Sequence, residues 1–202
     1  MSSVEHRAEP ASSRVAATAG PAQRLLSAAS ELFAVQGIRA VGVDQILREA
    51  AVAKASLYST YGSKDALVVA YLADLDQCDR NRWRQAVTDV ADPLARIMAF
   101  FDLAIASAPV RGFRGCLYAN AATEFPGTDL APVQEHRLWM HTTIAEQLCL
   151  ASQEATAEVS ADLARHIQLV YDGALVGSKI ERSVEPLQRA RAVALQLIKR
   201  DG

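Results

Sequence analysis

The stretch VDQILREAAVAKASLYSTYG, from Val43 to Gly62, decides the fold. Apolar residues follow helical spacing in two short runs within it: Val43, Ile46, Leu47 and Ala50, then Leu57, Tyr58 and Tyr61. A short turn over residues 51–54 joins the two runs, and this arrangement is typical of a helix-turn-helix motif. In that motif the second helix enters the major groove of duplex DNA. The stretch therefore indicates a surface that reads DNA.

Helical patterns continue on both sides of this stretch. A preceding helix is predicted to begin at Pro21 and end at Gly37, because proline suits a first helical turn and glycine a helix end. Ser63 can cap a following helix over residues 64–90. Further helices are expected over 93–107, 116–124, 132–152, 160–181 and 184–199. No segment alternates with period two, so the sequence predicts an all-α protein.

The chain divides into three parts by pattern. Residues 1–20 lack hydrophobic periodicity and are expected to form a flexible tail. Residues 21–66 form a small three-helix head that contains the helix-turn-helix motif. Residues 67–202 form a larger helical body. We find no internal repeat.

Composition restricts the class of protein. Half of the 202 residues are hydrophobic, which is enough for a substantial core, and the net charge is −2. Nucleic acid would therefore have to bind a local patch rather than the bulk charge. The three cysteines lack CxxC spacing, which argues against a disulfide framework or a zinc module. We see no signal peptide and no stretch long enough to span a membrane, and we expect a cytoplasmic protein.

The exposed side chains of the second motif helix are the expected DNA contacts. Those at its start would lie nearest the bases, and Lys54 can donate to guanine O6 and N7. Ser59 and Thr60 lie one turn further on. Tyr58 and Lys64 would meet the phosphate backbone. The full set of expected DNA-binding residues is Ala53, Lys54, Ala55, Ser56, Tyr58, Ser59, Thr60 and Lys64.

The longer run from Arg24 to Leu67 resembles the N-terminal DNA-binding domain of the TetR family of bacterial transcriptional regulators. The shared features are AASELF, Gly37 at the helix end, VDQI, LY in the second motif helix, and YGSKDAL. The later segments RGCLYANAATEF and LARHIQLVYDGALVGSKIERSVEPLQRARAVALQLI also resemble family members. The resemblance implies a repressor that binds palindromic operator DNA as a homodimer and is released by a small-molecule ligand. The body would then be a ligand-binding and dimerisation domain.

Three residues depart from the family pattern in the motif. Ala51 stands where the family often has glycine, and a left-handed backbone there would cost alanine on the order of 1 kcal/mol. Leu47 is larger than the usual alanine. Gly42 replaces a serine or threonine and loses a side-chain cap. These changes affect the details of DNA docking.

The last two predicted helices carry regular apolar stripes that can serve a dimer or an internal core. We assign the stripes to the dimer because the resemblance covers this stretch. The expected interface residues are Leu163, Ile167, Val170, Ala174, Gly177, Leu187, Ala190, Ala194 and Leu197.

Aromatic residues with a few polar groups mark the middle of the chain, as a small-molecule pocket requires, although aromatics at helical spacing are more often plain core. The expected ligand-binding residues are Phe100, Phe101, Tyr118, Asn120, Phe125, His136, Trp139, Met140 and Tyr171. In the family this region binds an inducer and moves the helix that leaves the head.

Other functions remain open at this point. Cys116 and Cys149 could sense oxidants, and a soft metal could bind His136, Met140 and His141, but neither set has diagnostic spacing. We therefore expect no metal and no cofactor. An all-α enzyme using Glu124, His136 or Asp172 is an alternative, as is a helical partner protein that binds no DNA. No nucleophile elbow, phosphate loop or metal motif supports an enzyme.

Overall fold

The computed structural model describes residues 19–126, 130–152 and 156–201. Within these residues all regular structure is helical, as expected. The helices are α2 (Pro21–Gln36), α3 (Val43–Ala50), α4 (Lys54–Tyr61), α5 (Lys64–Ala86), α6 (Pro93–Val110), α7 (Leu117–Glu124), α8 (Ala131–Ala151), α9 (Ala157–Glu181) and α10 (Glu185–Asp201). The expected tail falls on residues 1–20, of which 1–18 lie outside the described residues.

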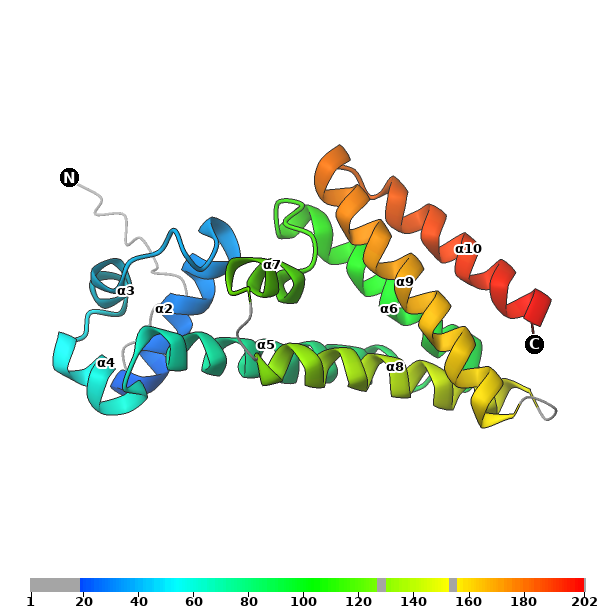
Figure 1. Ribbon diagram of the computed structural model, residues 1–202, viewed down its shortest axis with the longest axis horizontal. Coiled ribbons are helices and arrows are strands. Elements are labelled where there is room, and N and C mark those ends of the chain that lie inside the picture. The colour runs from blue at the N-terminus through cyan, green and yellow to red at the C-terminus, as the bar shows by residue number, and fades with distance from the viewer. Residues whose placement is uncertain (1–18, 127–129, 153–155, 202) are drawn as a thin grey trace, which may run out of the picture.

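Helices α2, α3 and α4 and the start of α5 form the head, at one end of the molecule (Figure 1). Leu25, Ala29 and Phe33 lie on one face of α2 because they are four residues apart, and all three are buried. Ile46 from α3 and Leu57 from α4 are fully buried in the same core. The head therefore has a hydrophobic core, and the opposite side of α4 is left free.

The turn between α3 and α4 has the left-handed backbone that its sequence suggested. Ala51 has φ 49° and ψ 50°, and the amide of Val52 donates to the Leu47 carbonyl at 3.1 Å. Alanine carries a steric cost in this conformation that glycine does not. The two motif helices are thus joined by a strained but hydrogen-bonded turn.

Helix α5 connects the head to the body (Figure 1). The Ser63 hydroxyl caps it by accepting the amide of Ala66 at 3.0 Å, and Asp65 follows in the first turn. The helix ends at Ala86, earlier than the predicted residue 90, because the amides of Val87 and Thr88 bond back to Trp83 and Gln85. Asp92 then caps α6 through two backbone amides.

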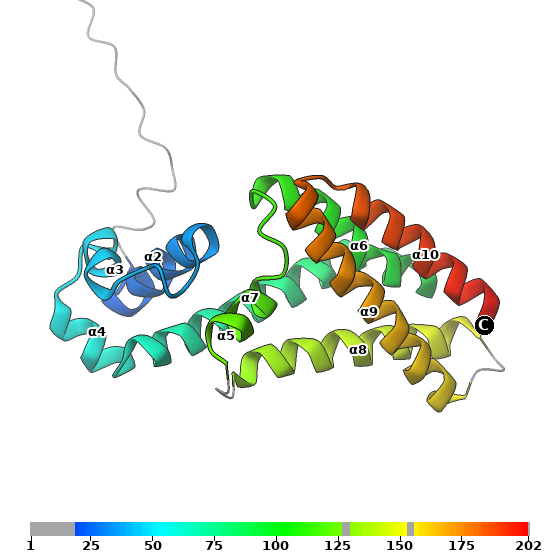
Figure 2. The same ribbon diagram turned by 45° about the horizontal axis from the view of Figure 1, so that its top comes forward.

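Helix α6 lies at the centre of the body, against α8, α9 and α10 (Figure 2). It is long and apolar enough to cross a membrane by length and composition alone, so the expectation of no such stretch was wrong. Ile97, Met98 and Phe101 on this helix are buried in the body core with residues of α8, α9 and α10. These contacts account for its apolar character as a core helix.

The short helix α7 lies between the head and the body in two views (Figures 1 and 2). The Cys116 thiol caps it by accepting the amide of Ala119. Gly115 before it has φ +69°, and a Cβ there would stand 3.1 Å from the Leu175 carbonyl oxygen of α9. Glycine therefore lets the chain approach α9 closely before it turns toward the head.

Candidate functional site

The outer face of α4 is open to solvent. Ala53, Lys54 and Ala55 at its start are exposed, and Tyr58 is 48% exposed one turn later. Ser59 and Thr60 are exposed as well, whereas Ser56 is half-buried, and Leu57 on the inner face is buried in the head core. Seven of the eight predicted DNA contacts therefore lie on α4 and at its start, the helix that such a motif offers to the major groove.

Lys64 is the eighth, and it points into the head. Its Nζ donates to the Ile38 carbonyl at 2.8 Å and lies 5.9 Å from the centre of the Phe33 ring. Burial lowers the pKa of Lys64, although nearby Asp65 and Glu124 oppose the shift. This contradicts the expectation of an outward phosphate contact, because the ammonium group holds the loop after α2 instead.

The body contains a cavity of about 100 Å³ between α5, α6, α7, α8 and α9. Six of the nine predicted ligand-binding residues line it: Phe100, Tyr118, His136, Trp139, Met140 and Tyr171. Trp83 stacks on Phe100 with ring centres 5.4 Å apart, and Trp139 meets both rings edge-on. The aromatic residues thus form a rigid apolar wall.

Three predicted ligand-binding residues do not line this cavity. Phe101 is fully buried in the body core, where its ring meets the Tyr171 ring edge-on. Asn120 donates to the Arg114 carbonyl and accepts from Lys179. Phe125 packs against the head core. Helical spacing in the sequence did not distinguish these residues from the six that line the cavity.

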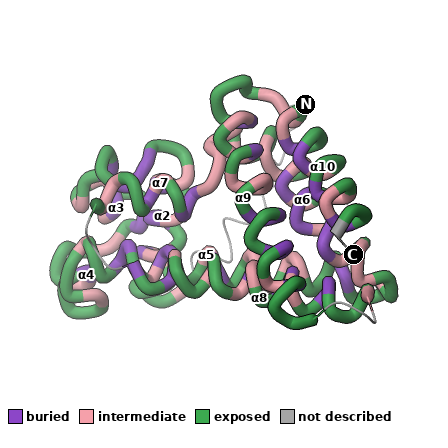
Figure 3. The backbone as a smooth tube through the Cα atoms, turned by 45° about the vertical axis from the view of Figure 1, so that its right-hand side comes forward, coloured by how far each residue is buried: buried purple, intermediate pink, exposed green. Residues whose placement is uncertain are grey.

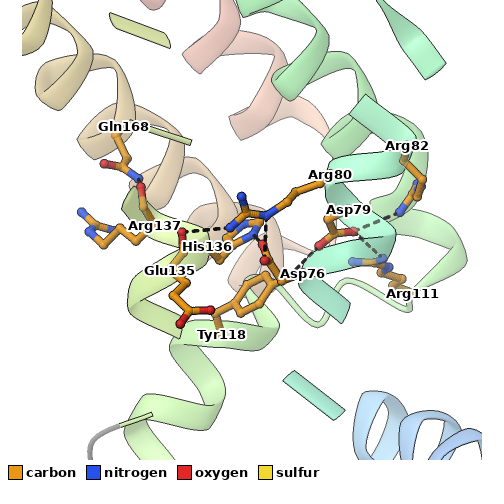
Figure 4. A network of polar contacts seen from close by, with 10 residues as sticks. All are labelled: Asp76, Asp79, Arg80, Arg82, Arg111, Tyr118, Glu135, His136, Arg137 and Gln168. Carbon is orange, nitrogen blue, oxygen red and sulfur yellow. Dashed lines mark hydrogen bonds and ion pairs between the residues drawn. The ribbon is translucent and has the colours of Figure 1, made fainter. Parts of the chain in front are cut away.

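Charged residues that the sequence reading missed also line the cavity. They are Asp79 and Arg82 from α5, and Arg111 and Arg114 from the segment between α6 and α7. Asp79 accepts from the Tyr118 hydroxyl at 3.1 Å and lies 3.4 Å from Arg111 and 3.5 Å from Arg82 (Figure 4). On the long helix α5, Asp79 and Arg82 look like part of an ordinary solvated face, so nothing in the sequence marked them.

Tyr118 is a neutral hydrogen-bond donor in this wall. Burial raises the pKa of its hydroxyl far above the ordinary value, and the Asp79 carboxylate raises that pKa further. Its ring stacks on the His136 ring with centres 3.9 Å apart. Tyr118 therefore joins the Asp79 carboxylate to the imidazole of His136.

A buried carboxylate, Asp76, joins α5 to α8 beside the cavity (Figure 4). It is 5% exposed, and its two oxygens meet His136 Nδ1 at 2.8 Å and Arg80 Nε at 2.7 Å. Burial lowers the pKa of His136 more than Asp76 raises it, so the imidazole is neutral at pH 7. The contact is therefore a hydrogen bond from Nδ1–H rather than an ion pair, and Nε2 is left as an acceptor.

The family described as "Bacterial regulatory proteins, tetR family" matches residues 25–71. The transcriptional regulator AcuR of Cereibacter sphaeroides is 31% identical over 176 residues, which cover 82% of this chain and 79% of AcuR. The chain belongs to the TetR family of bacterial transcriptional regulators.

Two further relatives agree with this assignment. The HTH-type transcriptional repressor DhaR of a Mycobacterium species is 24% identical over 186 residues, which cover 87% of this chain and 91% of DhaR. The structure of SCO4454, a TetR-family regulator of Streptomyces coelicolor, superposes with a TM-score of 0.78 at 27% identity. That match covers 89% of this chain and 95% of the other. The protein is thus a DNA-binding regulator and not an enzyme.

The residues of the enzyme alternative lie in different surroundings in this TetR-family chain. Glu124 accepts the backbone amide of Arg39 in the head. Asp172 pairs with Arg137 at the surface, and His136 lines the cavity. Among the described residues no group of three or more His, Cys, Asp or Glu side chains could hold a metal ion. Burial raises the pKa of the Cys116 thiol, which disfavours the reactive thiolate.

The predicted dimer stripes need correction. Leu163, Ile167, Ala174, Leu187, Ala190 and Ala194 are buried in the core of the single chain. Val170, Gly177 and Leu197 are half-buried, and a Cβ at Gly177 would stand 3.1 Å from Pro186 of the same chain. The six buried residues are unavailable because α9 and α10 pack on each other and on the body through them, whereas the three half-buried ones remain a prediction.

A different apolar face of α9 and α10 is exposed (Figure 3). On α9 it consists of Leu169, Gly173, Val176 and Ile180, which step by four, three and four residues. Ile180 is 75% exposed, and Val193 on α10 is 41% exposed. Sequence periodicity had shown two apolar faces on each helix, without showing which face packs in the core of the chain and which is left exposed.

Proposed function

We propose that this TetR-family regulator is a repressor that binds palindromic operator DNA as a homodimer and releases it when a small molecule enters the body cavity. It acts on DNA in the cytoplasm. The observation that carries the proposal is the free outer face of α4, which presents Lys54 and Tyr58 on a helix-turn-helix frame.

The DNA contacts follow from the chemistry of that face. Lys54 donates to guanine in the major groove, and Ala53 and Ala55 are small enough to let the helix approach the bases. Tyr58, Ser59 and Thr60 reach the phosphate backbone. Lys64 supports this contact from within, because it fixes the loop after α2 through the Ile38 carbonyl.

The homodimer is built on the exposed apolar face of α9 and α10. Leu169, Val176 and Ile180 would lose their contact with water on association, which is the main driving force for such an interface. Gly173 lies between them and allows close helix approach. A two-fold dimer presents two heads, so its operator is an inverted repeat.

The cavity sets the kind of effector. Its walls are mainly aromatic and aliphatic, as those of small-molecule pockets are. Its volume of about 100 Å³ is below the usual range of roughly 300–1,000 Å³, which restricts the effector to a very small molecule. The wall contains three arginines and one carboxylate: Arg82, Arg111, Arg114 and Asp79. This surplus of positive charge favours an effector that carries a negative charge.

Selection of bound fragments from sheared genomic DNA tests operator binding. The wild-type protein is expected to enrich a few fragments that share an inverted repeat. The double variant Lys54→Ala, Tyr58→Ala is expected to lose that enrichment, whereas the control Lys199→Ala, at the far end of α10, keeps it. Equal enrichment by the double variant would contradict the assignment of α4.

Repression is tested with the enriched fragment placed before a reporter gene. Co-expression of the wild-type protein is expected to lower reporter output, and the α4 double variant is expected to leave it unchanged. A rise in output with the wild-type protein would identify an activator instead.

A further inference from the structure

The loop that follows α2 is held from two separate helices. We call residues Gly37–Arg39 the head turn. The Arg39 amide donates to Glu124 Oε2 at 2.6 Å, and Glu124 is the last residue of α7. The Ile38 carbonyl accepts from Lys64 Nζ at 2.8 Å, and Lys64 is the first residue of α5. The orientation of the head thus depends on the position of the end of α7 relative to the start of α5.

Gly37 shows how closely α7 and the preceding loop press on the head turn. It has φ +91°, and a Cβ there would stand 3.2 Å from Glu124 Oε1 and 3.4 Å from Arg114 Nη2. The Arg39 guanidinium lies 5.8 Å from the centre of the Phe125 ring, directly after α7. Two side chains of opposite charge therefore lie beside the head at Gly37: Arg114 and Glu124.

Arg114 also belongs to the wall of the cavity. Its Nε is buried and has no hydrogen-bond partner among the described residues. Its carbonyl accepts from Asn120 on α7 at 3.0 Å, so its backbone is tied to the same helix. Arg114 thus lines the cavity and also lies beside Gly37 of the head turn.

Buried Tyr71 lies between the two regions. It packs edge-on against Phe33 of the head, with ring centres 5.3 Å apart. Burial is the main reason that the pKa of its hydroxyl is raised to about 12. Charged side chains near it also affect that pKa: Arg111, Asp79, Arg114 and Glu124. The charged groups of the cavity and of the head turn therefore surround one rigid side chain.

We propose that Arg114 and Glu124 form a clasp on the head turn that transmits occupancy of the cavity to the DNA-reading head. This inference rests on the proposed function. In the structure Arg114 lies against Gly37, and Glu124 holds the Arg39 amide. An occupant that attracts or displaces the Arg114 guanidinium removes the neighbouring positive charge from Glu124. The end of α7 then shifts relative to α5, and the whole head rotates with it.

Coupling of this kind is reciprocal, so operator binding must also change the conformation of the residues around the cavity. The chain has two tryptophans, Trp83 and Trp139, and both line the cavity. Their emission therefore responds to changes in the cavity wall. Hydrogen exchange of residues 111–124 reports the loop and helix that carry the clasp.

The experiment uses the full-length protein and the operator duplex recovered by fragment selection. Binding is followed by the anisotropy of labelled DNA, together with tryptophan emission and hydrogen exchange. In the wild type we expect operator, but not unrelated duplex, to change the emission and slow exchange over 111–124. Glu124→Ala and Arg114→Met are expected to bind operator within about tenfold of the wild type and to lose both responses. The control Glu181→Ala, exposed at the end of α9, keeps them.

The possible results distinguish a failure of the clasp from a failure of the proposed function. If both variants respond like the wild type, or if wild-type binding changes neither signal, the clasp is overturned and operator binding still stands. If the wild type prefers no duplex over another, the proposed function fails and the clasp fails with it. Faster exchange of the Arg39 amide in Glu124→Ala, with unchanged exchange at Leu57, shows that the head remains folded in that variant.

Discussion

Asp76 on α5 and His136 on α8 are joined by a hydrogen bond of 2.8 Å between Oδ1 and Nδ1. Arg80 occupies the other carboxylate oxygen at 2.7 Å. Both oxygens of a buried carboxylate are thus satisfied at the place where the helix leaving the head crosses the body. The pair fixes α8, which supplies three side chains of the cavity wall, His136, Trp139 and Met140.

Replacing Asp76 by alanine is expected to lower the free energy of unfolding by about 3 kcal/mol, because it leaves buried donors of His136 and Arg80 without their acceptor. Urea unfolding followed by circular dichroism measures the change. The matched control is Asp162→Ala, whose ion pair with Arg165 is exposed and is worth about 0.5 kcal/mol or less. Equal effects of the two substitutions would contradict the structural role of Asp76.

His136 is expected to make stability depend on pH. Burial lowers its pKa in the folded state below the unfolded value of about 6.5, so the unfolded chain binds more protons in the window between the two pKa values. Stability is therefore lost as the pH falls below about 6.5. His136→Gln should flatten this dependence in urea unfolding between pH 7.5 and 5. Exposed His166→Gln serves as the control and should keep the wild-type slope.

The left-handed Ala51 offers a stabilising substitution. Ala51→Gly removes the steric cost of φ 49°, and the gain exceeds the added flexibility of the unfolded chain by about 0.5–1 kcal/mol. Ala55→Gly, in the first turn of α4, should instead destabilise by about 0.5–1 kcal/mol, because glycine is a poor helix former. Thermal unfolding of the two variants distinguishes them, and a loss of stability in Ala51→Gly would show that the turn is not strained.

The exposed face of α9 is expected to hold the dimer together. Val176→Asp places a charge at its centre and should convert the protein to monomers, as measured by light scattering coupled to size-exclusion chromatography. Val110→Asp alters a valine on α6 that is 87% exposed, and it should leave the oligomeric state unchanged. A Val176→Asp variant that keeps the wild-type mass in solution would place the interface elsewhere.

Sequence patterns predicted the helices well because their starts and ends carry local signals. Ser63, Asp92 and Pro93 mark helix starts by capping chemistry that needs no tertiary contact. The end of α5 was placed four residues too late, because a turn directly after Ala86 ends it without a glycine. Helix existence was thus easier to predict than helix length.

The cavity and the interfaces were harder to predict because they depend on which way a side chain faces. Asp79 and Arg82 on α5 look like solvent-facing charges in the sequence, yet they line the cavity. Lys64 looks like a phosphate contact, yet its ammonium group faces the Ile38 carbonyl. Ile167 and Val176 both suit a buried helix face, and only the packing of α10 and α8 shows that Ile167 is the one in the core.

The most direct test of DNA reading by α4 is an anisotropy titration with duplex DNA from upstream of the protein's own gene, at two salt concentrations. We predict selective binding that weakens with salt, and a loss of about 1–3 kcal/mol in the binding free energy on Lys54→Ala. The control Lys199→Ala should bind like the wild type. Equal affinity for unrelated DNA, or unchanged affinity in the double variant Lys54→Ala, Tyr58→Ala, would contradict the assignment of α4 as the DNA-reading helix.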